Sequence, residues 1–99
     1  MTIGSLVIKN QGIGVASQYQ GFTGYDGILG IGPVDLTEDT TSNGGEVPTV
    51  TNNAYSAGSI PSNSIGISFE PTTSESVTNG ELTFGGVDTS KYTGALTYV

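Results

Sequence analysis

Seven consecutive residues decide how this chain can fold, and they read Asp26-Gly27-Ile28-Leu29-Gly30-Ile31-Gly32. Glycine at every second or third position excludes a helix, because each glycine adds backbone freedom that folding must remove. Glycine within extended chain is typical of places where another backbone approaches closely. With Pro33 ending the run, the stretch predicts tightly packed, non-helical backbone.

Short strands are predicted on the N-terminal side of this stretch. Apolar residues alternate with others over Ile3 to Ile8 and again over Ile13 to Val15, which is the period of a strand. Polar residues and Gly21 predict a loop from Gln18 to Phe22.

One short helix is predicted on the C-terminal side. The segment from Asp35 to Glu46 is acidic, rich in Gly, Thr and Ser and nearly free of apolar residues, so we expect a mobile loop. The helix then starts at Pro48 or Thr49 and ends at Ala57, with Gly58 closing its C-terminal end. Because it has fewer than three turns, only packing can stabilise it.

The remainder of the chain is predicted to be rich in strands. Ile65 to Phe69 alternates in the strand pattern, and Leu96 to Val99 closes the chain in the same way. Asn79-Gly80 favours a type I′ turn, because both central residues of that turn need positive φ. The predicted fold class is therefore mainly β with one short helix.

Length and composition allow one domain at most. A chain of 99 residues can remove roughly 64% of its extended surface from water. Hydrophobic residues make up 34% while Gly 16 and Pro 4 take a fifth of the chain, which excludes a helix bundle. No apolar run is long enough for a membrane span, and the N-terminus lacks the pattern of a signal peptide, so no membrane insertion is expected.

The charge balance excludes polyanionic partners. Nine acidic residues stand against Lys9 and Lys91, and the net charge is -7. Neutralising phosphates requires clustered Lys and Arg, so we expect no nucleic-acid partner and no anionic membrane surface. Solubility rests on Ser, Thr and Asn, which stay hydrated at acid pH where carboxylates lose their charge.

Cysteine and histidine are both absent. A disulfide, a thiolate nucleophile, a zinc cluster and a Ser-His-Asp triad are therefore excluded within these residues. Asp35, Glu38 and Asp39 could offer oxygen atoms to calcium, but their spacing is not that of an EF-hand, and a solvated acidic loop is the favoured interpretation. No metal and no cofactor are expected.

A second glycine motif lies near the C-terminus and reads Phe84-Gly85-Gly86-Val87-Asp88-Thr89-Ser90-Lys91-Tyr92-Thr93-Gly94. Together with Asp26 to Gly32, it resembles the pepsin-like aspartic endopeptidases. Stretches such as Ser68 to Ser76 resemble in particular the polyporopepsin-type enzymes of basidiomycete fungi. The resemblance covers nearly the whole chain and implies a partial pepsin-like (acid protease) lobe. Residues 1–99 would be a single β-rich unit, equivalent to the end of the N-terminal lobe plus the start of the inter-lobe sheet.

The catalytic motifs of that family do not occur in these 99 residues. The family needs two carboxylates that share a proton, one per lobe, each within Asp-Thr-Gly or Asp-Ser-Gly. Asp88-Thr89-Ser90 is the nearest string, but it lacks the glycine and falls in a turn of the family pattern. Asp26 falls at a supporting position, and the flap hairpin is also missing. We therefore predict no catalytic residue and no enzymatic activity for this chain as it stands.

The resemblance also places Tyr25 and Ile28 where the family lines its substrate pocket. The family's scaffold motif corresponds to Asp26, Gly27, Ile28, Leu29, Gly30, Phe84, Gly85 and Gly86. The alternative is that Tyr25 and Ile28 are core residues of a Gly-rich turn. Tyr19, Phe22 and Tyr25 form a candidate binding patch, since Tyr offers a large rigid contact area, although these rings could equally be core residues that have lost their cover.

Two functional hypotheses follow. The first is a free-standing, non-catalytic, secreted fungal protein that binds a protein receptor, for which the immunomodulatory class of small fungal proteins is a model. The second is a segment or processing fragment of a secreted pepsin-like endopeptidase. A lectin-like carbohydrate binder is a weaker third interpretation. Both main hypotheses predict an extracellular location. If the 99 residues fold alone, we expect a homodimer or larger assembly through unpaired strand edges.

Overall fold

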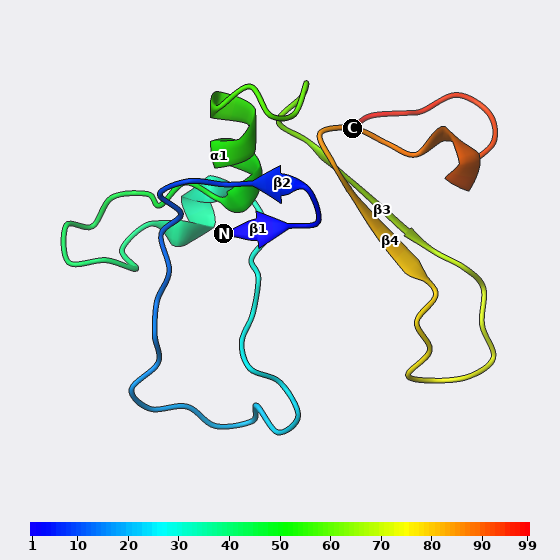
Figure 1. Ribbon diagram of the computed structural model, residues 1–99. Coiled ribbons are helices and arrows are strands. Elements are labelled where there is room, and N and C mark those ends of the chain that lie inside the picture. The colour runs from blue at the N-terminus through cyan, green and yellow to red at the C-terminus, as the bar shows by residue number, and fades with distance from the viewer.

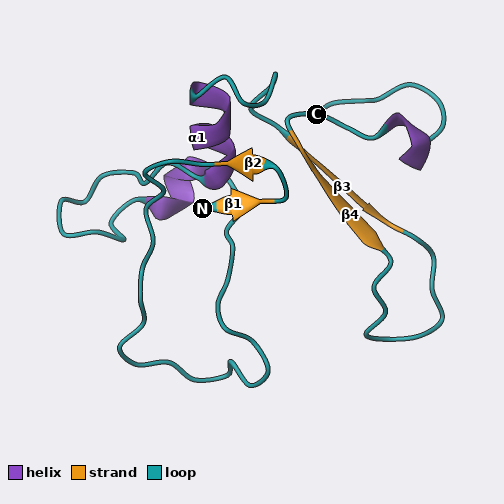
Figure 2. Ribbon diagram, in the orientation of Figure 1, coloured by secondary structure: helices purple, strands orange, loops and turns teal.

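The computed structural model describes residues 1–99, and most of the chain is loop (Figure 2). The elements are β1 (Thr2–Ile3), β2 (Leu6–Val7), the 3-10 helix η1 (Val34–Thr37), α1 (Val50–Ser56), β3 (Ile65–Phe69), β4 (Gly80–Phe84) and the 3-10 helix η2 (Thr89–Lys91). The β1–β2 pair lies beside α1, and the β3–β4 pair forms a separate ribbon (Figure 1). Strands and loops with one α-helix confirm the predicted fold class.

Local signals define α1 at both ends, as the sequence predicts. The Thr49 hydroxyl accepts a hydrogen bond from the Asn52 amide at 3.0 Å, and the Asn52 side chain accepts one from the Thr49 amide at 2.9 Å. This capping box satisfies two backbone donors that a helix start leaves free. At the other end Gly58 adopts φ 72°, and the Ser59 amide donates to the Ala54 carbonyl at 2.9 Å, which closes the last turn.

β3 and β4 pair antiparallel, from Phe69 opposite Gly80 to Ile65 opposite Phe84. β3 has the predicted bounds, but the predicted type I′ turn at Asn79-Gly80 is wrong. Neither residue has positive φ, and Gly80 is already the first residue of β4. The chain reverses over 70–79 instead, and hydrogen bonds between Glu70, just after β3, and Asn79, just before β4, close this loop.

Three predicted strand segments are wrong in whole or in part. Ile3 to Ile8 contains a hairpin, since Gly4 adopts φ 58° and the chain reverses there. Ile13 to Val15 forms no strand, and its two apolar side chains are 90% and 91% exposed. Leu96 to Val99 is also loop. A strand needs a neighbour for its backbone hydrogen bonds, and none of these 99 residues supplies one to the last two segments.

A small core joins α1 to the strands. Its buried apolar residues are Ile8, Val50, Ala54 and Ile60, and Ile3, Leu6 and Phe84 pack against them. Phe84 belongs to β4, so the core links the two strand pairs. The longest helix has seven residues, and no helix has the length and apolar character needed to cross a membrane.

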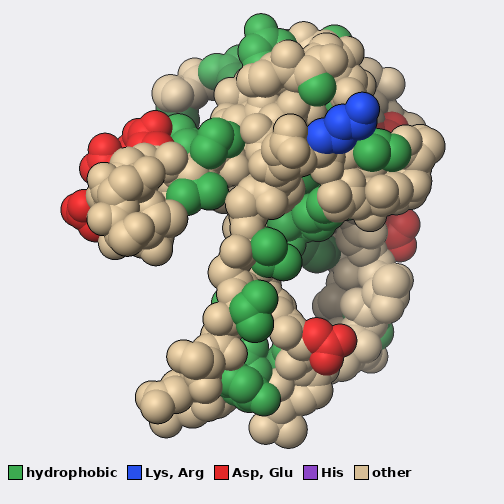
Figure 3. All heavy atoms as spheres, turned by 60° about the vertical axis from the view of Figure 1, so that its left-hand side comes forward, with side chains coloured by type: hydrophobic (Ala, Val, Ile, Leu, Met, Phe, Trp, Pro, Cys, Tyr) green, Lys and Arg blue, Asp and Glu red, His purple; other side chains and the backbone are tan.

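The chain is far more open than a globular protein of its size. Its accessible surface is 8143 Å², whereas a compact monomer of 10.1 kDa exposes about 5,300 Å². Its radius of gyration is 16.0 Å against about 13 Å for a compact domain of this length. Hydrophobic side chains stay uncovered along the limbs that project from the body (Figure 3). The surface therefore contains apolar faces that no other part of these 99 residues covers.

Candidate functional site

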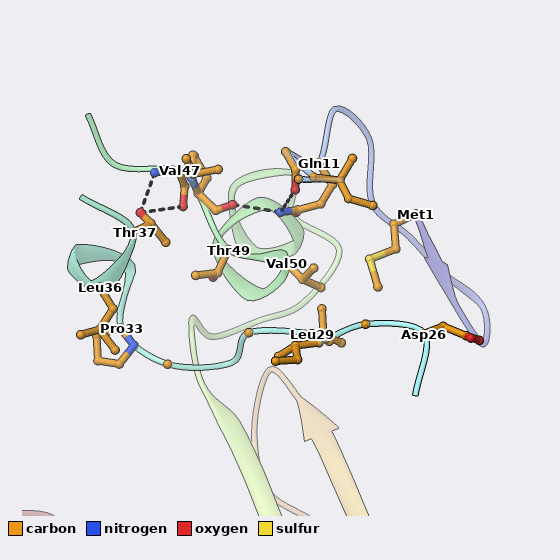
Figure 4. Close-up of a pocket in the computed structure, with 18 residues that line it drawn as sticks. Met1, Gln11, Asp26, Leu29, Pro33, Leu36, Thr37, Val47, Thr49 and Val50 are labelled. Atoms are coloured by element: carbon orange, nitrogen blue, oxygen red, sulfur yellow. Dashed lines mark hydrogen bonds between the residues drawn. The ribbon is translucent and has the colours of Figure 1, made fainter. Parts of the chain in front are cut away.

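A hollow of about 990 Å³ lies between the Asp26–Gly32 segment and the N-terminal end of α1. The segment runs along one side of it, and Gln11, Thr49 and Val50 lie across from it (Figure 4). Leu29 and Val50 face the same space, whereas Asp26 lies at the far end of the segment (Figure 4). The predicted scaffold segment thus forms one wall of this hollow.

Long-range hydrogen bonds hold the wall opposite this segment. The Gln11 side chain donates to the Pro48 carbonyl at 3.1 Å and accepts from the Asn53 side chain at 2.8 Å. The Val47 amide donates to the Thr37 hydroxyl at 2.7 Å, which ties the two ends of the acidic loop together. Sequence reasoning missed Gln11, Asn53 and Thr37, because partners ten to 42 residues apart leave no local pattern.

The predicted substrate-pocket residues are both exposed. Tyr25 is 74% exposed and Ile28 is 82% exposed, and Ile28 lines the hollow while Tyr25 does not. Within this chain neither residue is a core residue of the Gly-rich turn. The predicted tight packing of Gly27 and Gly30 is also not seen, since a Cβ built on either would meet nothing within 4 Å.

Two of the three residues in the candidate binding patch contact each other. The rings of Tyr19 and Phe22 meet edge to face, with centroids 6.3 Å apart and an interplanar angle of 87°. This is a favoured geometry for aromatic pairs. The Tyr25 amide donates to the Phe22 carbonyl at 3.1 Å, so one turn contains Phe22 and Tyr25, and Tyr19 reaches it through the contact with the Phe22 ring.

Asp88 has a structural role at η2. Its carboxylate accepts hydrogen bonds from the Ser90 hydroxyl at 2.6 Å and from the Ser90 amide at 3.0 Å. These two hydrogen bonds hold the pKa of Asp88 at about 2, below its usual 3.8. A carboxylate that is already paired with the N-terminal end of a short helix is a capping group.

The Phe84-Gly85-Gly86 motif connects β4 to the core. Phe84 packs against the core cluster, and the Gly85 amide donates to the Ser64 carbonyl at 2.8 Å. Gly85 is buried at φ 89°, where side chains are disfavoured. No group of three or more His, Cys, Asp or Glu side chains is arranged to hold a metal ion.

Comparisons with known proteins agree on one family. The family model of the eukaryotic aspartyl proteases matches residues 1–99. Polyporopepsin from Irpex lacteus is 62% identical over 100 residues, which cover 99% of this chain and 29% of that protein. Cathepsin D from Dictyostelium discoideum is 34% identical over 103 residues, which cover 100% of this chain and 25% of that protein.

A solved structure shows the same arrangement. The crystal structure of an aspartic proteinase from Irpex lacteus matches with a TM-score of 0.86 at 62% identity, over 95% of this chain and 28% of that one. This chain therefore spans less than a third of the length of the curated relatives named above. The similarity in sequence and shape extends over nearly all its residues, and the chain belongs to the eukaryotic aspartyl protease family, with a pepsin-like fold.

Proposed function

We propose that these residues act as a non-catalytic part of a secreted pepsin-like acid endopeptidase, and that they form one wall of its substrate cleft. In this proposal they correspond to the end of the N-terminal lobe and the start of the sheet between the lobes. The catalytic carboxylates are then supplied by other parts of the same protein, because neither Asp-Thr-Gly nor Asp-Ser-Gly occurs here.

The excess surface is the observation that carries the proposal. The chain exposes 8143 Å², about half as much again as a compact protein of its mass, yet it matches the proteinase structure with a TM-score of 0.86. A chain that has the shape of the relative but leaves its apolar faces uncovered is expected when it is one part of a longer folded protein. The same open faces are hard to reconcile with a stable protein of 99 residues.

The hollow supports a role next to a substrate. Ile28 and Leu29 present aliphatic surface into a space of about 990 Å³, and the opposite wall is held by hydrogen bonds to Gln11. Apolar walls with a few fixed polar groups are typical of ligand sites. In the proposed enzyme, Ile28 contacts a substrate side chain in the hollow, and the neighbouring strands of the lobe fill the rest of it. Tyr25, which lies outside the hollow, contacts the same substrate from the preceding turn.

The size of the native protein tests the proposal. Peptides from residues 1–99 are expected in a secreted species more than three times as long as this chain. That species should cleave casein at acid pH, and pepstatin should inhibit it. A native species of 10.1 kDa without proteolytic activity would instead support the free-standing binding protein. No observation in the structure or the comparisons favours that hypothesis or its immunomodulatory form over the enzyme segment.

Two substitutions in the active proteinase test the pocket wall. Ile28→Ala is expected to raise KM for substrates with a large apolar side chain and to affect small ones less. Val15→Ala removes a similar aliphatic group that does not line the hollow, and it should leave this preference unchanged. Equal effects of both variants on all substrates would show that Ile28 is only a packing residue.

A further inference from the structure

The chain contains two Asn-Gly dipeptides, Asn43-Gly44 and Asn79-Gly80. Asparagine followed by glycine is prone to deamidation, because the backbone nitrogen of a residue without Cβ can approach the asparagine side-chain carbonyl. Ring closure also requires rotation of the asparagine main chain and side chain. The local structure around each dipeptide therefore decides whether the reaction proceeds.

Asn43 lies exposed on the acidic loop that projects from the body beside η1 (Figure 1). Its side-chain oxygen accepts hydrogen bonds from the Thr41 hydroxyl at 2.6 Å and from the Gly45 amide at 3.1 Å. Two donors on one carbonyl oxygen draw electrons from its carbon and stabilise the negative charge that develops during attack. The side-chain nitrogen of Asn43, which must leave, makes no hydrogen bond to the protein.

The nucleophile at this site is weakly held. The Gly44 amide donates to the Thr41 carbonyl at 3.0 Å, in a turn whose residues 41–43 are exposed. This hydrogen bond must open before Gly44 can attack, and rotation of Asn43 also strains its two side-chain hydrogen bonds and the one from the Asp39 amide to the Gly44 carbonyl at 3.2 Å, all of which lie within the same loop. Exposed loop hydrogen bonds open at much lower free energy than those in paired strands.

Hydrogen bonds and close packing constrain the Asn79-Gly80 dipeptide more tightly than Asn43-Gly44. Its side-chain nitrogen donates to the Glu70 carbonyl at 2.6 Å, and its own carbonyl accepts from the Glu70 amide at 3.0 Å. Gly80 is extended in β4, and the Phe69 ring lies 2.6 Å from the position that a Cβ would occupy. The main chain and side chain of Asn79 are both fixed, so ring closure requires the end of the β3–β4 ribbon to separate.

We propose that Asn43 is a site of spontaneous deamidation in the folded protein and that Asn79 is protected from it. The Gly44 nitrogen loses its proton to solvent base and bonds to the side-chain carbon of Asn43. The bond from that carbon to the side-chain nitrogen breaks as the NH2 group takes up a proton and leaves as ammonia, and a succinimide ring forms. Water then opens the ring at either carbonyl and yields aspartate or isoaspartate. No oxidant or reductant is involved.

The product changes the charge of a loop that is already acidic. One further carboxylate joins Glu38, Asp39 and Glu46 within a few residues. The step depends on loss of a proton from a backbone amide, so its rate rises with pH. A protein that works in acid would keep Asn43 intact there and accumulate the modified form when it is held at neutral or alkaline pH.

Cleavage after glutamate separates the two sites for measurement. It produces residues 39–46, which contain only Asn43-Gly44, and residues 76–81, which contain only Asn79-Gly80. The native protein is incubated in mildly alkaline buffer and then cleaved, and mass spectrometry measures the fraction of each peptide that has gained one mass unit. The rate of this gain should be about tenfold higher in peptide 39–46 than in peptide 76–81. Isoaspartate should appear in the same peptide.

Three controls make the result specific. In denaturant the two peptides should react at similar rates, because the structural difference is lost. Asn43→Gln should abolish the gain in 39–46, whereas Asn79→Gln should leave it unchanged. Thr41→Val removes one donor and should slow the reaction at Asn43, with circular dichroism confirming an unchanged fold. Equal rates at both sites in the native protein, or a faster reaction at Asn79, would overturn the proposal.

Discussion

Gly85 lies so close to Ile60 that a Cβ built on Gly85 would be 2.6 Å from the Cβ of Ile60. The contact joins the end of β4 to the residue that follows the turn after α1. Gly85 also has φ 89°, a backbone conformation that side chains disfavour. Both reasons for glycine at this position come from the tertiary structure.

Gly85→Ala is therefore expected to destabilise the protein by about 1–3 kcal/mol, through overpacking against Ile60 and backbone strain. Urea denaturation gives the free energy of unfolding. Gly86→Ala is the matched control, because a Cβ on Gly86 meets nothing within 4 Å and its φ is not positive. A Gly85 variant as stable as the Gly86 variant would contradict the packing described.

Thr49→Ala should lower the free energy of unfolding by about 1 kcal/mol, since the Asn52 amide loses its acceptor at the start of α1. Thr49→Ser keeps the hydroxyl oxygen and should retain most of the stability. If both variants were equally unstable, the loss would come from the Thr49 methyl group and not from the cap.

The stability of η2 should depend on pH through Asp88. Its pKa is lowered from 3.8 to about 2 by the Ser90 hydrogen bonds, so the charged form is favoured in the folded protein. This contribution is fully present above the unfolded pKa and is lost as the pH falls through about 2. An NMR titration of the carboxyl carbon measures the shift directly.

Ser90→Ala removes the hydroxyl donor and should raise the pKa of Asp88 toward its usual value. The Ser90 backbone donor remains in this variant, so part of the shift should persist. A pKa of Asp88 that does not move in Ser90→Ala would show that the hydroxyl does not contribute.

The isolated 99-residue chain should self-associate, because Ile67 and Leu82 face each other across β3 and β4 and both remain exposed. Sedimentation at tens of micromolar should show a dimer or larger species. Ile67→Lys should weaken this association, whereas Ser68→Lys places the same charge on the other face of β3 and should weaken it less. A strictly monomeric wild-type chain would refute the expectation.

Signals within a few residues allowed correct prediction from the sequence. The Thr49 start and Gly58 end of α1 were predictable because caps depend on neighbours in the chain. The alternation from Ile65 to Phe69 likewise located β3. The glycine motifs at Asp26 and Phe84 indicated the family, which the family model and the relatives confirm.

The tertiary structure decided everything that depends on a distant partner. Ile13 to Val15 has a strand pattern but stays exposed, because strand formation requires a neighbour that these residues do not contain. Asn79-Gly80 has the composition of a tight turn, yet its hydrogen bonds to Glu70 hold it at the end of a strand pair. The sequence by itself thus determined the local elements and the family. Strand pairing and burial were decided by contacts between segments far apart in the chain, since composition does not specify which partners are within reach.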